Sequence, residues 1–170
     1  MGYLQDIISE ASSNSVDVPR LLRLCLILGH RLKYEPLINW ARMELDGYPS
    51  DIEVPAYRSV SVLNKGRFAG QWSGVFELPL IRLPENMQVA FSSHDYRSGV
   101  AELSDLIQRS SAKSSGSLHV PWPVELANHY YSDLIAGSSC IAAWREISVS
   151  AFAGTLDQIT TRILDFALSI

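Results

Sequence analysis

Apolar residues at helical spacing dominate the first third of the chain. A first helix is predicted over residues 4–11, where apolar side chains recur at i, i+3, i+4 and i+7. A second helix is predicted to follow Asp17, its N-cap, with Pro19 in its first turn. Its residues 21–32 form an apolar run. Because this run carries apolar residues on most sides, we expect it to be the most buried helix. A third helix is predicted over residues 36–45.

The period of the pattern changes after Gly47, which we expect to end the third helix in a left-handed cap. Residues 59–62 alternate serine with valine, which is typical of a half-buried strand. Residues 66–74 are rich in glycine and are predicted to form a connection. Residues 75–83 and 87–91 are predicted to be two further strands.

The C-terminal third alternates helical and extended segments. These are a helix over 100–109, a mobile serine-rich loop over 110–117, an extended segment over 118–123, a helix over 123–134, a strand over 140–149 and a final helix over 150–170. Helices on both sides of a run of strands indicate an α+β fold. We therefore expect the N-terminal helices and the long C-terminal helix to pack on a mostly antiparallel sheet, with residues 1–170 forming a single domain.

The composition predicts how the protein closes its core, where in the cell it lies and which partners are less favoured. Of its 170 residues, 47% are hydrophobic, so the chain can close a core without metal ions or disulfides. Cys25 lies in the apolar second helix, which predicts a buried free thiol, and Cys140 is far from it in sequence. This use of cysteine predicts a reducing, cytoplasmic location. A net charge of −4 makes nucleic acid a less favoured partner. No apolar run approaches the roughly 20 residues of a membrane span, so no membrane association is expected.

Known catalytic and cofactor motifs are missing from the sequence. It contains no GxGxxG, no P-loop and no HExxH, and the GQWSG segment at 70–74 places its serine one position too late for a hydrolase elbow. The histidines lack metal-ligand spacing with one another: His30, His94, His119 and His129. We therefore expect no cofactor and no bound metal, and we favour a protein that is not an enzyme.

The run from Leu21 to Arg58 resembles the opening of the AbiTii domain of bacterial abortive-infection and antiphage defence proteins. The residues that carry the resemblance are Leu21, Leu22, Arg23, Arg31, Leu32, Trp40, Glu44, Leu45, Gly47, Tyr48, Pro55, Tyr57 and Arg58. The segments 118–123 and 163–168 are also similar to that family, whereas residues 65–115 are less so. The resemblance implies a role in phage defence, but it implies no settled activity and no catalytic residue.

Two interpretations of this run remain open. In the first it is a folding device, in which Trp40 anchors the third helix to the sheet and Glu44 pairs with Arg23, Arg31 or Arg58. In the second a polar site lies between the helices and the sheet. The candidate residues of that site are Arg23, Arg31, Glu44, Tyr57 and Arg58. The arginines of the second helix suit either a phosphate-binding surface or ion pairs with the acidic residues of the third helix.

Three functions follow from these patterns. The favoured hypothesis is a non-enzymatic interaction or oligomerisation module, whose partner is another protein or a second copy of the chain. The apolar repeat of the final helix continues to Ile170. Such a repeat is expected of a buried last helix, of an assembly surface, or of the N-terminal part of a longer protein. The alternatives are a toxic effector enzyme that acts on a nucleotide or nucleic acid through the arginines, and a sensor of a phage protein. The sensor would use an open sheet face near Trp72, Trp122 and the 110–117 loop.

Overall fold

The computed structural model describes residues 2–112 and 116–170, which fall into two compact units. The helical unit takes its described residues from 1–58, 96–112 and 152–170, and the sheet unit takes its described residues from 59–95 and 113–151. Each unit is therefore assembled from segments that are distant in sequence. The single domain expected over 1–170 stays a prediction, because such units are compatible with one domain or with two.

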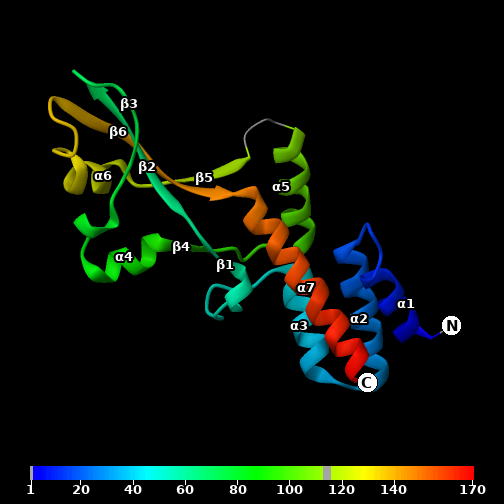
Figure 1. Cartoon of the computed structure of the whole chain (residues 1–170). Helices are drawn as coiled ribbons and strands as arrows, with labels where there is room; N and C mark the ends of the chain where they lie inside the picture. Colours follow the sequence, from blue (N-terminus) through cyan, green and yellow to red (C-terminus); the bar gives the residue numbers. More distant parts are fainter. Residues whose placement is uncertain (1, 113–115) are drawn as a thin grey trace. The chain divides into compact units, whose positions relative to one another are not determined.

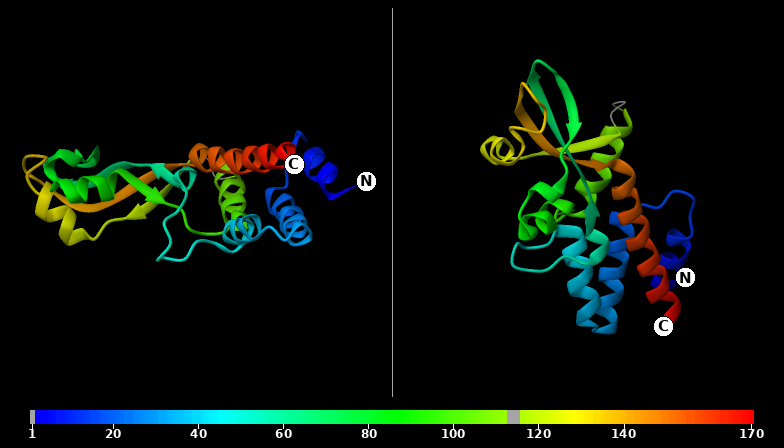
Figure 2. Two further views of the ribbon diagram at one scale, coloured as in Figure 1. Left: turned by 90° about the horizontal axis from the view of Figure 1, so that it is seen from below. Right: turned by 60° about the vertical axis from the view of Figure 1, so that its left-hand side comes forward.

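The helical unit contains the three N-terminal helices in the predicted order (Figure 1). Their bounds are α1 Tyr3–Ala11, α2 Val18–Leu32 and α3 Glu35–Asp46; the short helix η1 (Ala56–Arg58), α5 (Val100–Ala112) and most of α7 (Val149–Ser169) complete the unit. The side chain of Asp17 accepts a hydrogen bond from the Arg20 N–H at 2.9 Å, which confirms the predicted cap of α2. Figure 2 shows α2 and α3 running side by side, and the two helices are in contact.

The core of the helical unit forms around one face of α2. Leu21, Leu22 and Cys25 are fully buried there, whereas Arg23 and Ile27 on the other side of the helix are exposed. The remaining core residues come from α1, α3, η1, α5 and α7, among them Ile7, Ala41, Tyr57, Val100, Ile159 and Ile163. The apolar faces of the N-terminal helices are thus buried against one another and against α5 and α7.

Gly47 and Gly99 allow the end of α3 and the start of α5 to approach each other closely. Gly47 has the predicted positive φ of 102°, but its ψ of 166° lies outside the left-handed helical region. The backbone of the neighbouring Tyr48 then donates a hydrogen bond to the Arg97 carbonyl at 2.8 Å. A Cβ on Gly99 would lie 2.1 Å from the Leu45 carbonyl oxygen, so only glycine fits this close approach.

The sheet unit contains two antiparallel sheets, which confirms the α+β class. β1 (Ser59–Ser61) pairs with β4 (Ser93–Asp95), and a four-stranded sheet has the order β3-β2-β6-β5. The strands of the larger sheet are β2 Leu63–Gly70, β3 Gly74–Glu77, β5 Ser117–Pro121 and β6 Ser138–Ser148. The other elements of this unit are η2 (Leu80–Arg82), α4 (Glu85–Ser92) and α6 (Val124–Tyr131).

Three predicted segments of the sheet unit were wrong in whole or in part. The strand expected over 75–83 ends at Glu77, and Leu80–Arg82 form the short helix η2 instead. The connection expected over 66–74 is mostly strand, because β2 runs to Gly70 and β3 starts at Gly74. The strand expected over 87–91 is helix α4, whose Met87 and Phe91 lie one turn apart and pack on the same core. Valine and phenylalanine favour strands, but this packing outweighed that preference. Of the loop expected over 110–117, residues 113–115 lie outside the described part of the chain.

One face of the larger sheet is covered and forms the second core. Phe68 of β2 and Cys140 of β6 pack there with Tyr131 of α6. Trp122 also belongs to this core, with 4% of its surface exposed, and its indole N–H donates to Asn64 Oδ1 at 3.2 Å. The sensor hypothesis placed Trp122 on an open sheet face, and that placement was wrong, because the β5–α6 connection turns the indole inward.

None of the helices in the described residues combines the length and apolarity that a membrane span requires.

Candidate functional site

Three of the five candidate residues meet inside the helical unit. Glu44 comes from α3, and Tyr57 and Arg58 come from η1. Glu44 and Arg58 are both 0% exposed, and the guanidinium donates to Glu44 Oε2 from Nη2 at 2.5 Å and from Nε at 3.1 Å. Both donors therefore meet one carboxylate oxygen, and hydrogen bonds between charged groups are roughly twice as strong as neutral ones.

The second oxygen of Glu44 accepts hydrogen bonds from two tyrosines. The hydroxyl of Tyr48 donates to Oε1 at 2.6 Å, and that of Tyr57 donates to the same atom at 2.5 Å. Burial, and after it the hydrogen bond to Glu44, raises the pKa of Tyr57 to about 12. The same causes raise the pKa of Tyr48 above its ordinary range. Both tyrosines therefore stay neutral donors over the physiological range.

The remaining donors of Arg58 bind backbone carbonyls. Nη1 donates to the carbonyls of Tyr96 at 3.2 Å and Ser98 at 2.5 Å, and Nη2 also reaches the Glu44 carbonyl at 3.5 Å. All five N–H groups of the guanidinium are thereby used. We call Glu44, Tyr48, Tyr57 and Arg58 the buried cluster. It ties α3, η1 and the 96–98 segment together and leaves none of its own charged groups facing solvent.

The other two candidate residues do not join the buried cluster. Arg23 and Arg31 are exposed, because they lie on α2 outside its buried face. The guanidinium carbon of Arg31 is 4.2 Å from the centre of the Tyr3 ring, and Arg20 lies 3.8 Å from Glu10. Within the described residues, these arginines form no ion pair with the acidic residues of α3. Glu44 instead pairs with Arg58, which was one of the predicted options.

Tyr57 links the buried cluster to the surface of the helical unit. Its hydroxyl accepts a hydrogen bond from the Trp40 indole N–H at 2.8 Å. The guanidinium carbon of Arg162, on α7, lies 4.7 Å from the centre of the Tyr57 ring, within the range of a cation–π contact. The Thr155 hydroxyl donates to the Tyr57 carbonyl at 2.9 Å. The buried cluster therefore positions one side chain of α3 and one of α7.

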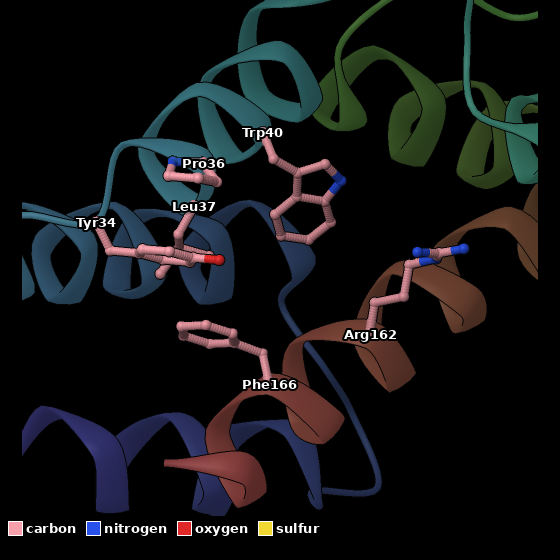
Figure 3. Close-up of a pocket in the computed structure, with 6 residues that line it drawn as sticks. All are labelled: Tyr34, Pro36, Leu37, Trp40, Arg162 and Phe166. Atoms are coloured by element: carbon pink, nitrogen blue, oxygen red, sulfur yellow. The ribbon is translucent and has the colours of Figure 1, made fainter.

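Trp40 and Arg162 line an open groove between α3 and α7 (Figure 3). The groove has a volume of about 230 Å³, and its other lining residues are Tyr34, Pro36, Leu37 and Phe166. The rings of Tyr34 and Phe166 are nearly parallel, with centroids 6.0 Å apart and an angle of 9° between their planes. Trp40 was expected to anchor α3 to the sheet, but it packs instead against the helical core beside this groove.

The charge of the groove comes from Arg162. Its side chain is exposed, and no carboxylate of the described residues lies within ion-pair distance of it. Its contact with the Tyr57 ring leaves the guanidinium N–H groups available to an incoming group. The groove thus combines an aromatic wall with one uncompensated positive charge.

The model of the AbiTii family matches residues 3–170, nearly the whole chain. The chain belongs to the AbiTii family. This family membership assigns it to bacterial abortive infection, a form of antiphage defence. No curated protein and no solved structure matches the chain.

The other groups of this AbiTii chain that could carry chemistry are buried or dispersed. Cys25 is free and buried, as predicted, and burial raises the pKa of its thiol to about 12. Cys140 is also free and buried. No cluster of three or more metal-ligating side chains occurs within the described residues. His119 Nε2 lies 3.6 Å from Glu146 Oε2. The pKa of Glu146 is lowered mainly by the hydrogen bond from Lys65 and less by His119.

Sequence reasoning on this AbiTii chain missed Arg162, Tyr34 and Phe166. The apolar repeat predicts the final helix, but it does not show which residues of that helix face α3. Tyr34 precedes α3 and had no periodic signal. The approach of α7 to α3 joins residues more than one hundred positions apart, so no local pattern could have revealed the groove.

Proposed function

We propose that this AbiTii chain acts in abortive infection as a non-enzymatic interaction module that uses the α3–α7 groove. The observation that carries the proposal is the aromatic wall of Tyr34, Trp40 and Phe166 beside Arg162, which forms no ion pair with any carboxylate of the described residues. Aromatic residues and arginine are the side chains that most often dominate the binding energy of protein interfaces. A partner that presents an apolar side chain next to a carboxylate would satisfy both parts of the groove.

The size of the groove supports a protein partner over a larger small molecule. Pockets for drug-sized ligands have volumes of roughly 300–1,000 Å³. The groove, at about 230 Å³, is smaller and open. One inserted side chain fits these dimensions, whereas a whole nucleotide would leave most of its surface in water.

The buried cluster has a defined part in this proposal. Glu44 holds the Tyr57 hydroxyl, and Tyr57 in turn holds the Trp40 indole and underlies the Arg162 guanidinium. Side chains fixed before binding lose less entropy when a partner binds. We therefore assign Glu44, Tyr57 and Arg58 a positioning role behind the groove.

The effector-enzyme hypothesis needed the candidate arginines in one accessible site. Arg58 is instead buried, with its donors bound inside the protein, and Arg23 and Arg31 lie exposed on α2. The geometry therefore supports the interaction module better than this form of enzyme.

A specific observation favours the sensor hypothesis as the second candidate. On the sheet unit, Leu63 and Val75 are about half exposed, and Val75 lies opposite Arg67 in the β2–β3 register. Trp72, in the turn between these strands, is 68% exposed. These side chains form a mixed apolar and charged surface of the kind that binds proteins.

Site-specific photo-crosslinking tests the proposed function. A photoreactive phenylalanine analogue replaces Tyr34 in the groove, which keeps the aromatic ring and Arg162, and separately a photoreactive residue is placed at position 23 on α2 and at position 67 on β2, in cells challenged with phage. We expect a discrete protein adduct at position 34 and only background at position 23. A strong adduct at position 67 without one at position 34 would favour the sensor surface and overturn the assignment of the groove.

A further inference from the structure

We infer that the occupant of the α3–α7 groove is the loop Pro49–Pro55 of a second copy of this chain. The inference rests on the proposed function and names the partner of the same groove. The loop and the groove both belong to the helical unit, and none of the residues that line the groove lies in the loop. Each copy therefore carries one donor surface and one acceptor surface.

The loop is held in one shape by hydrogen bonds. The Ile52 N–H donates to the Pro49 carbonyl at 3.2 Å and closes a turn. Arg97 Nη1 donates to the carbonyls of Pro49 and Ile52 at 2.6 Å each. Val54 is buried and anchors the end of the loop. The tip is thus presented in a fixed conformation, which lowers the entropic cost of binding.

The tip of the loop has the chemistry that the groove requires. Ile52 is 40% exposed, and its neighbours Asp51 and Glu53 are both exposed carboxylates. No ion pair joins either carboxylate to a cation of the described residues. An isoleucine side chain can lie against the aromatic wall of the groove while an adjacent carboxylate reaches Arg162. The charges of the two surfaces are complementary, and burial of Ile52 removes an exposed branched side chain from water.

The geometry of the contact constrains the assembly. Because a loop of one copy binds a groove of the next, the contact is heterologous unless two copies exchange loops reciprocally. Reciprocal exchange closes a dimer, and non-reciprocal contact builds a ring or an open chain. In either case the mass rises with protein concentration.

A charge-swap experiment tests whether the loop of a second copy occupies the groove. Sedimentation velocity is measured over a concentration series for the full chain, for Arg162→Glu, for Asp51→Lys/Glu53→Lys, and for the combination of all three substitutions. We expect each charge reversal to weaken self-association by about tenfold or more, since close charge pairs across interfaces couple by roughly 1.5 kcal/mol upward. The combination should recover much of the loss. Arg23→Glu, an exposed charge reversal on α2, should leave the association unchanged.

The outcomes separate this inference from the proposed function. A wild-type chain that stays monomeric throughout, or a combined variant that associates no better than the single reversals, overturns the second-copy occupant. If the chain is monomeric and Arg162→Glu still abolishes phage protection, the groove binds a different protein and the proposed function stands. If Arg162→Glu changes neither association nor protection, both fail. Matching melting temperatures for all variants exclude loss of fold as the cause.

Discussion

At the scale of single residues, Glu44 is the centre of the polar interior of the helical unit. It accepts hydrogen bonds from Tyr48, Tyr57 and Arg58 while fully buried. A buried ion pair adds little net stability compared with an apolar pair, because both charges lose their hydration. Removing one partner is costly, however, since the other charge stays buried. The pair therefore enforces one arrangement of α3 and η1 more than it adds stability.

Replacing Glu44 by glutamine should destabilise the protein strongly. The side-chain shape is kept, but the Arg58 charge is left in the interior without a counter-charge. We expect the free energy of unfolding to fall by about 3–5 kcal/mol, measured by urea denaturation. The matched control is Glu35→Gln on the exposed first turn of the same helix, which should change the free energy by less than about 0.5 kcal/mol. Similar effects of the two substitutions would show that the buried cluster is not a structural element.

Alkaline pH should weaken the protein through its buried tyrosines. The pKa of Tyr57 is raised from its ordinary value of 10 to about 12, so the folded state keeps the proton after the unfolded state has lost it. The stabilisation is complete below pH 10 and is lost as the pH rises toward 12. The free energy of unfolding should fall in that window by about 1.4 kcal/mol per pH unit for each such tyrosine.

Urea denaturation between pH 8 and about pH 11 checks this slope. The Tyr57→Phe variant should be less stable at neutral pH, since Glu44 and Trp40 each lose a hydrogen bond. It should also show a shallower decline above pH 10. An unchanged slope in this variant would mean that Tyr57 titrates normally in the folded protein.

At the scale of elements, the sequence predicted the helices better than the strands. The helices α1, α2, α3, α5 and α7 each carry an apolar stripe that the local pattern reveals. Helix α4 is only eight residues long and contains residues that favour strands, so the local pattern did not predict it. The packing of Met87 and Phe91 on the core of the sheet unit favours the helix. The glycines of β2 suggested a connection, although Gly66 lies within the strand, where an added Cβ would meet the side-chain ends of Leu78 and Cys140.

Two glycine-to-alanine substitutions should act in opposite directions on the helical unit. Gly154 is exposed in α7 and an added Cβ meets nothing within 4 Å, so alanine should stabilise the protein by roughly 0.5–1 kcal/mol. Gly99 at the start of α5 has the Leu45 carbonyl in the path of a Cβ, so alanine there should destabilise by about 1–3 kcal/mol. Thermal unfolding followed by circular dichroism measures both changes. Equal shifts of the same sign would contradict the close approach of α5 to the end of α3.

At the scale of the whole molecule, the sequence revealed the site only in part. The run 21–58 drew attention to Glu44, Tyr57 and Arg58, and the Glu44–Arg58 pair was one of the options considered. Arg23 and Arg31 were grouped with them by charge, but the phase of α2 turns both away from its buried face. Arg58 also donates to the backbone carbonyls of Tyr96 and Ser98. Every residue has a backbone carbonyl, so the residue types in the sequence could not predict these contacts. The groove itself depends on α7 approaching α3, a contact between distant segments.

The central claim is that the α3–α7 groove is the surface through which this AbiTii chain protects cells. Two charge reversals at exposed arginines test it in the full chain: Arg162→Glu in the groove and Arg67→Glu on the sheet unit. The measurement is the efficiency of phage plating on cells that carry each variant at equal protein levels. We predict that Arg162→Glu raises plating to the level of cells without the protein, and that Arg67→Glu leaves protection intact. Full protection by Arg162→Glu together with its loss in Arg67→Glu would contradict the claim.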